Sequence, residues 1–147
     1  MTWTCKKFEE LSLDELYDIM QLRSKVFVLE QNCAYLDPDG KDKKAYHLCG
    51  WDDQLLVAYA RLLAPGISYP EASIGRVVSD PDHRRKGAGK QLMQNAITAA
   101  YDIFDPEAIR IGAQLYLLDF YTALGFRQVS EIYLEDGIEH IEMLYSK

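Results

Sequence analysis

Cysteine is scarce in this sequence, and its three copies follow no pattern typical of a disulfide framework or a zinc site. Cys5, Cys33 and Cys49 are odd in number, and no two are spaced as Cys-x-x-Cys. Small secreted domains stapled by disulfides usually carry an even set of cysteines. We therefore expect reduced, mostly buried thiols and a cytoplasmic protein.

Long apolar runs and internal repeats are also missing. No stretch approaches the ~20 apolar residues that a membrane-spanning helix needs. The N-terminal segment Trp3–Phe8 is interrupted by Lys6 and Lys7, which is unlike a signal peptide. The 147 residues suffice for one domain with a substantial core and are too few for two. We expect a single domain, residues 1–147, with no membrane association.

Positive charge is in deficit, with 16 Lys and Arg against 23 Asp and Glu, a net charge of −7. Proteins that bind nucleic acid usually present a basic face, so this balance argues against that class. It is compatible with a cationic substrate and equally with a role in solubility. Asp37, Asp39 and Asp42 could form a negative substrate mouth. A lone Asp-x-Asp lacks the ligand set of a calcium site, so no metal is expected.

One basic, glycine-rich segment stands out against this acidic background. Val77 and Val78 lead into a turn, and Arg84-Arg85-Lys86-Gly87-Ala88-Gly89-Lys90 then opens a helix expected to reach about Phe104. A helix N-terminus presents unpaired N–H groups and a positive dipole end, which together bind phosphate. The glycines permit close approach, and the cations add charge. A G-x-G-x-x-G dinucleotide motif is excluded because its third glycine position holds Leu92.

Hydrophobic periodicity and turn signals predict one α/β (α+β) domain with a mixed, mostly antiparallel sheet flanked by helices. A capping box at Ser12 and Glu15 opens a first helix that runs to about Leu29, and a polar loop, Glu30–Lys44, follows. Asp136-Gly137 is a strong hairpin turn. The expected strands are Thr2–Phe8, Tyr46–Trp51, Leu55–Leu63, Ser73–Val78, Ile109–Ala113, Arg127–Leu134 and Ile138–Tyr145, and the later helices are Gly87–Phe104 and Leu117–Leu124.

With these motifs in this order, the chain resembles the GNAT (GCN5-related N-acetyltransferase) superfamily, and within it the ElaA-like branch. Arg84-Arg85-Lys86-Gly87-Ala88-Gly89 matches the phosphate-binding pattern R/Q-x-x-G-x-G/A. The second shared feature is a short helix that carries Tyr121 and ends in Gly125-Phe126. The features similar to the ElaA-like branch are Arg23, Val26-Phe27-Val28, Glu30-Gln31, Asp37-Pro38-Asp39 and Ile74-Gly75-Arg76-Val77-Val78.

The resemblance implies acetyl-CoA as cosubstrate, with its phosphates on the loop from Arg84 to Lys90. It also implies that the fourth and fifth strands splay apart, often at a β-bulge, and that the pantetheine arm enters the gap. The N–H of Val77 or Val78 would then stabilise the oxyanion that develops on the thioester carbonyl. Gln114 stands where many relatives carry Asn and would bond the pantetheine or the neighbouring backbone.

Tyr121 is the catalytic residue that the resemblance suggests. When an amine attacks acetyl-CoA, coenzyme A leaves as a thiolate, and a nearby phenol can donate a proton or a hydrogen bond to it. A free tyrosine has a pKa of ~10 and so carries its proton at neutral pH. A packing role on an apolar helix is the alternative, since the chain has ten tyrosines.

The general base is harder to assign. Relatives often place a glutamate on the fourth strand, but this chain has Ser73, Gly75 and Arg76 there. The remaining candidates for substrate contact or base are the following three: Glu30, His47 and His140. Water is an alternative route for the proton.

The sequence thus predicts an acetyl-CoA-dependent N-acetyltransferase that acts on a primary amine of a small molecule or peptide. The alternative is a non-catalytic acyl-CoA-binding or sensor protein, which would keep the phosphate loop but need no proton donor. Either protein could act as a monomer or as a homodimer. Thiol release from acetyl-CoA across a panel of amines separates the two functions.

Overall fold

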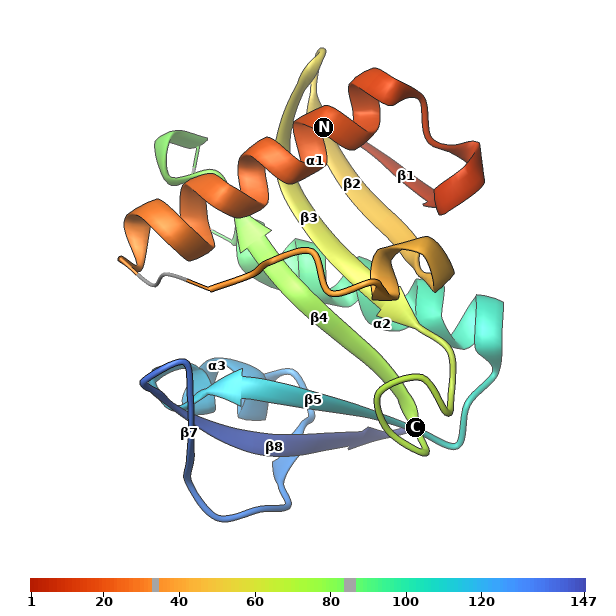
Figure 1. Cartoon of the computed structure of the whole chain (residues 1–147). Coiled ribbons are helices and arrows are strands. Elements are labelled where there is room, and N and C mark those ends of the chain that lie inside the picture. The colour runs from red at the N-terminus through yellow and green to blue at the C-terminus, as the bar shows by residue number, and fades with distance from the viewer. Residues whose placement is uncertain (33–34, 84–86) are drawn as a thin grey trace.

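The computed structural model describes residues 1–32, 35–83 and 87–147 (Figure 1). In these ranges eight strands form one sheet in the order β1-β2-β3-β4-β5-β8-β6, and β7 pairs with β8. Every neighbouring pair is antiparallel except β4–β5, which is parallel. The mixed, mostly antiparallel sheet flanked by helices that the sequence predicts is therefore confirmed.

The strands match the expected ones closely, with one exception given below. They are β1 Thr2–Lys7, β2 Tyr46–Asp52, β3 Leu55–Leu63, β4 Ala72–Ser79, β5 Ala108–Gln114, β6 Arg127–Gln128, β7 Tyr133–Glu135 and β8 Ile138–Ser146. The helices are α1 Leu13–Arg23, α2 Ala88–Phe104 and α3 Leu118–Ala123, and short 3-10 turns occupy Phe8–Glu10, Lys41–Lys44, Pro81–His83 and Leu115–Leu117. No helix within the described ranges is long and apolar enough to cross a membrane.

The first helix begins and ends as local sequence dictates. Ser12 Oγ accepts from the Glu15 N–H at 3.0 Å, and Glu15 Oε1 accepts from the Ser12 N–H at 2.8 Å, so the capping box is confirmed. After Arg23 the helix continues as a π-helix, Ser24–Glu30. This wider turn is a local irregularity of the kind often found at functional sites. It brings the C-terminal end of the helix, with Glu30, to a cavity described below.

The predicted strand Arg127–Leu134 is wrong as a single element, because it divides into β6 and β7. Ser130 interrupts it: its Oγ accepts from the Glu142 N–H at 2.8 Å and donates to the Glu131 carbonyl at 2.9 Å. A side chain therefore takes a bond that a strand backbone would otherwise make. The Asp136-Gly137 hairpin that joins β7 to β8 forms as predicted.

Helices cover both faces of the sheet (Figure 1). On one face, Ile19, Leu22 and Val26 pack on Tyr59 of β3 and Val78 of β4. On the other, buried side chains of α2 and α3 join those of β5 and β8 in the larger core. Successive strand residues alternate between the two faces, which is why neighbouring apolar residues belong to different clusters.

Strands β4 and β5 separate soon after they meet. Their ladder consists of Ala72–Ile109 and Ser73–Arg110 and then stops, and Figure 1 shows the two strands diverging toward their C-terminal ends. On its other side, β4 shifts register against β3 between Tyr59 and Arg61. Two β4 residues there oppose one β3 residue, which is a β-bulge. The splay predicted between the fourth and fifth strands is confirmed.

Candidate active site

A cavity of about 450 Å³ occupies the opening between β4 and β5. Val77, Val78 and Gln114 lie beyond the last ladder pair, Ser73–Arg110, and all three line the cavity. The predicted Val77, Val78, Gly89, Gln114, Tyr121, Glu30 and His140 all line it.

Backbone geometry on the β4 wall is unusual at the bulge. Arg76 adopts a φ of 48°, a left-handed conformation that L side chains rarely take. Its guanidinium donates from Nε to Asp37 Oδ1 at 2.9 Å and lies over the Tyr35 ring at 5.7 Å. These contacts hold the bulge, and the next residues, Val77 and Val78, line the opening.

The N-terminus of α2 borders the same cavity. Gly87 is its N-cap, with φ 84° and ψ 0°, so the chain enters the helix through a left-handed residue that favours glycine. Ala88 is the first helical residue, Lys90 is exposed, and Gly89 faces the cavity beside the ring of Phe120. The predicted phosphate-binding residues Arg84, Arg85 and Lys86 lie outside the described residues, and their role stays a prediction.

Tyr121 lies at the floor of the cavity, on the α2 and α3 side of the sheet. Its ring packs edge-on against Phe120 at 5.1 Å and Phe126 at 5.7 Å between centroids. The residue is only 5% exposed, and burial raises the pKa of its phenol to about 12. A phenol in this environment holds its proton at neutral pH and can act only as a donor or a weak acid.

Gln114 ends β5 and forms an amide pair across the cavity. Its Nε2 donates to Gln31 Oε1 at 3.1 Å, and Gln31 Nε2 donates back to Gln114 Oε1 at 3.4 Å. Gln31 follows the π-helix, so the pair connects the first helix to the far side of the splay. Gln114 therefore has a partner already, one that the sequence did not predict.

His140 lies beside Gln114 on β8 and is 7% exposed. Its Nδ1 is 2.8 Å from the Ile138 carbonyl oxygen, which can only accept, so Nδ1 carries the proton. Its Nε2 is 3.5 Å from Glu135 Oε2, and its ring stacks on Tyr133 at 5.9 Å. In the neutral ring, Nε2 is thus the basic nitrogen.

The acidic loop is not the negative mouth that the sequence allowed. Asp37, Asp39 and Asp42 are each bonded to arginines at 2.7–3.0 Å: Arg23 binds the first and third, and Arg61 binds the second and third. The arginine partners hold the pKa values of Asp39 and Asp42 below their usual range. Because all three carboxylates are paired with arginines, they form a network that packs the loop against the sheet, with Asp37 and Asp42 buried and Asp39 at its more exposed edge. None of the three is left as an unopposed negative charge for a substrate.

The model of the acetyltransferase (GNAT) domain matches residues 16–147. The chain belongs to the GNAT acetyltransferase family. "UPF0039 protein sll0451" of Synechocystis is 40% identical over 99% of this chain and 95% of its own length. "Protein ElaA" of Escherichia coli is 41% identical over 96% of this chain and 94% of its own.

Solved structures agree. The crystal structure of an acyl-CoA N-acyltransferase from Pseudomonas aeruginosa has a TM-score of 0.92 and 43% identity, and it covers 99% of this chain and 100% of its own. That of Escherichia coli ElaA has a TM-score of 0.91 and 38% identity over the same shares. The predicted family and branch are confirmed, and the chain is a GNAT N-acetyltransferase.

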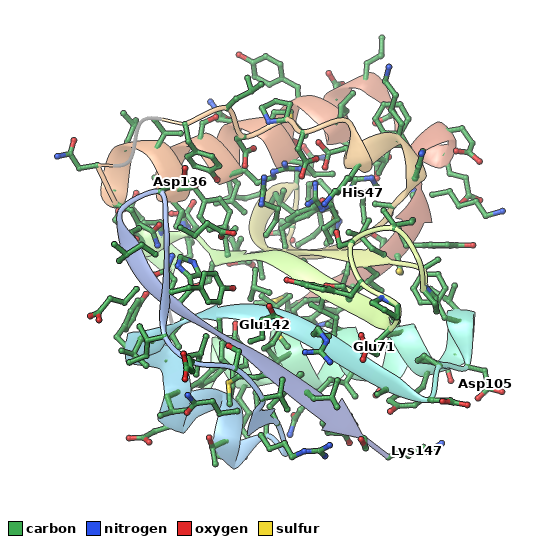
Figure 2. All side chains as sticks on the ribbon, turned by 60° about the horizontal axis from the view of Figure 1, so that its bottom comes forward. His47, Glu71, Asp105, Asp136, Glu142 and Lys147 are labelled. Atoms are coloured by element: carbon green, nitrogen blue, oxygen red, sulfur yellow. The ribbon has the colours of Figure 1, made fainter. Side chains whose placement is uncertain are left out.

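His47 is a candidate that this GNAT structure does not bring to the cavity. It is fully buried on β2, with Nδ1 2.7 Å from Tyr59 Oη and Nε2 2.9 Å from the Asp42 carbonyl. Figure 2 shows it among packed side chains, apart from Asp136 at the β7–β8 turn. Burial lowers the pKa of His47, so its ring is neutral and structural. Expecting it to contact a substrate was wrong.

Two residues of the GNAT cavity carried no role in the sequence analysis. Gln31 pairs with Gln114, and Glu135 faces His140. The hairpin signal in the sequence could have located Glu135, because a two-residue Asp136-Gly137 turn places residues 135 and 138 opposite each other. Within the described ranges, no group of three or more His, Cys, Asp or Glu side chains is arranged to hold a metal.

Proposed function

We propose that this GNAT protein transfers the acetyl group of acetyl-CoA to a primary amine by direct attack of the amine on the thioester. The proposal rests on the early end of the β4–β5 ladder after Ser73–Arg110, with a cavity in the opening. Separated strands leave backbone groups without ladder partners, and an extended ligand with amides, such as pantetheine, can satisfy them. The Pseudomonas neighbour is named an acyl-CoA N-acyltransferase, which agrees with this reading.

The phosphate groups suit the N-terminus of α2. Gly87 meets no atom within 4 Å at its Cβ position, so a phosphate can approach its backbone closely. The first N–H groups of the helix, from Ala88, Gly89 and Lys90, point out of its N-terminus without helical partners. The basic run Arg84–Lys86 adds positive charge by sequence alone. When bound, acetyl-CoA supplies the activated acyl group.

Three parts of the chain then act on the reacting atoms. The backbone N–H of Val77 or Val78 donates to the thioester oxygen as negative charge develops on it. Tyr121 donates its phenolic proton or a hydrogen bond to the leaving thiolate, since burial keeps that phenol protonated. Gln114 has two possible roles. Its amide either gives up its hydrogen bond to Gln31 and bonds the pantetheine amide, or it keeps that bond, and the Gln31–Gln114 pair closes the end of the cavity.

The acceptor enters from the α1 face of the sheet, where Glu30, Glu135 and Asp136 line the cavity. Carboxylates along this wall favour an amine that arrives as an ammonium ion. The wall also offers the rings of Phe27 and Tyr35. An alkyl amine of a small molecule or of a peptide fits this combination of charge and apolar surface.

The test begins with binding and ends with turnover. Acetyl-CoA should raise the unfolding temperature, because a ligand at 100 times its Kd stabilises the folded state by about 2.7 kcal/mol. A 3′-dephospho analogue should stabilise it less. Thiol release should follow with a panel that includes spermidine, lysine and a lysine-containing peptide.

Each outcome is decisive. A thermal shift with amine-dependent thiol release supports the transferase. A shift without thiol release at any amine or pH would indicate the non-catalytic acyl-CoA-binding protein. No shift at millimolar acetyl-CoA would reject the cosubstrate itself.

A further inference from the structure

We propose that His140 is the general base of this GNAT enzyme, taking the proton of the acceptor ammonium at Nε2, and that Glu135 positions its imidazole. The inference deepens the proposed function and rests on it. The position that carries the base glutamate in many relatives, on the fourth strand, holds no carboxylate in β4. The amine must lose a proton before it can attack, so another group or solvent has to accept it.

The position of His140 in the sheet places it in the opening between β4 and β5. It pairs with Gln114 across β5–β8, and Gln114 lies beyond the point where the β4–β5 ladder ends. Val77, His140 and Tyr121 line one cavity. The imidazole therefore lies in the same cavity as the part of the β4 backbone that would meet the thioester.

Strand alternation also sets which face His140 occupies. Its neighbour Ile141 packs in the core with α2, α3 and Tyr121, so His140 faces the opposite side, where α1 lies. The acid candidate and the base thus approach the opening from opposite faces. This arrangement is compatible with direct attack, because the base acts on the amine nitrogen and the acid acts on the leaving sulfur, which are different atoms.

Hydrogen bonds fix the imidazole in the form a base needs. The Ile138 carbonyl accepts from Nδ1 at 2.8 Å, so the neutral ring presents an unprotonated Nε2. The Tyr133 ring stacks on the imidazole at 5.9 Å, and Glu135 Oε2 lies 3.5 Å from Nε2. The carboxylate stabilises the imidazolium that forms when the proton is taken. Glu135 is 60% exposed, so this help is modest.

Protons and bonds balance in this scheme. The ammonium gives one proton to His140 Nε2, the amine nitrogen bonds the acetyl carbon, and the carbon–sulfur bond breaks. The thiolate takes a proton from Tyr121, and Tyr121 regains one from the second N–H of the attacking nitrogen through water. His140 returns its proton to solvent. The products are the amide, coenzyme A as thiol and one proton in solution.

Other charged groups near the imidazole bear on any pH profile. Glu142 shares its face of β8, Gln114 on β5 is uncharged, and Glu135 and Tyr133 come from β7. The remaining ionisable neighbours on the described cavity wall are the following: Glu30, Tyr35, Arg76, Tyr116, Tyr121 and Asp136.

The deciding experiment is the pH profile of kcat/KM for an amine that the wild type acetylates, such as spermidine, in His140→Gln and Glu135→Gln. His140→Gln should lower kcat/KM by ~10²-fold or more at pH 7. Its rate should then keep rising into alkaline pH, where the amine loses its proton unaided. Affinity for acetyl-CoA should not change. Glu135→Gln should lower kcat/KM at pH 7 by at most about fivefold, since the carboxylate that it removes is 60% exposed.

Glu139→Gln is the matched control, because Glu139 precedes His140 on β8 and so points to the opposite face. A second measurement needs no turnover. The imidazole ¹⁵N spectrum of the wild type, which has three histidines, should show the Nδ1–H tautomer for the signal that His140→Gln removes.

The outcomes separate this inference from the proposed function. If His140→Gln keeps the wild-type pH profile and rate, or if the spectrum shows the Nε2–H tautomer, His140 is not the general base, and the proposed transferase activity is unaffected. A wild type that acetylates no amine of the panel would overturn both. A His140→Gln variant whose kcat/KM is low at neutral pH and recovers at alkaline pH supports His140 as the base.

Discussion

Asp42→Asn tests the buried ionic network, since one carboxylate oxygen serves two buried arginines there. Asp42 Oδ1 accepts from Arg23 Nη1 at 2.7 Å and from Arg61 Nη1 at 3.0 Å. The side chains of these arginines are 0% and 5% exposed. With Arg76, Asp37 and Asp39, the set holds three positive and three negative charges. The asparagine leaves one positive charge uncompensated and out of water.

Removing one partner of a buried ion pair typically costs about 3–5 kcal/mol. A domain of this size has a total unfolding free energy of about 5–15 kcal/mol, so the variant should lose a large share of it. The corresponding fall in Tm is roughly 6–20 °C, at about 2–4 °C per kcal/mol. Urea unfolding at pH 7, followed by tryptophan fluorescence, measures the loss.

Asp102→Asn is the matched control, because Asp102 is exposed on α2. It should change stability by less than about 0.5 kcal/mol. A loss below about 1 kcal/mol in Asp42→Asn, equal to the control, would refute the view that the network stabilises the loop.

The same variant makes a prediction about pH. Arginine contacts hold the folded-state pKa values of Asp39 and Asp42 below their unfolded values, which lie near ~3.9. A depressed carboxylate pKa contributes stability that is full above the unfolded pKa and is lost as pH falls through the folded one. The stability gap between wild type and Asp42→Asn should therefore be constant near neutrality and narrow below about pH 4. A gap that widens in acid would contradict the assignment.

Two further predictions concern the proposed transfer. Tyr121→Phe keeps the ring contacts with Phe120 and Phe126 but removes the hydroxyl. Single-turnover rates should therefore fall ~10- to 1000-fold, while the affinity for acetyl-CoA stays the same. An unchanged rate would mean that water supplies the proton. Gly87→Val should weaken acetyl-CoA binding measured by calorimetry, and Gly66→Val should not. Both glycines have a left-handed φ, 84° at Gly87 and 93° at Gly66, and open space at the Cβ position, but only Gly87 caps α2. Equal acetyl-CoA affinities in the two variants would mean that the loop at Gly87 is only a turn and does not bind phosphate.

Local signals in the sequence account for much of the fold. The capping box at Ser12, the Asp136-Gly137 turn and the glycine before α2 each involve residues close in the chain, and each forms as predicted. The splay of β4 from β5 followed from the family resemblance. Nothing in the periodicity of either strand distinguishes a ladder of two pairs from a full one.

Long-range pairing explains what the sequence could not give. Arg23, Arg61 and Arg76 come from a helix and two strands, and only the folded sheet brings them to the acidic loop. His47 and His140 look alike in sequence, since each is one histidine on a strand. Their surroundings differ because of the neighbouring strands. His47 contacts Tyr59 in a closed core, and His140 pairs with Gln114 at the open end of β5.

The network and the candidate site are mechanically connected through Arg76. Its left-handed φ of 48° costs of order 1–3 kcal/mol and persists only where surrounding contacts hold it. Those contacts are the bond to Asp37 at 2.9 Å and the Tyr35 ring, and Asp37 is in turn held by Arg23. Weakening the network should therefore relax the bulge and move the backbone of Val77. If so, Asp42→Asn lowers kcat at temperatures where it is fully folded, whereas a network that only stabilises the loop would leave kcat unchanged.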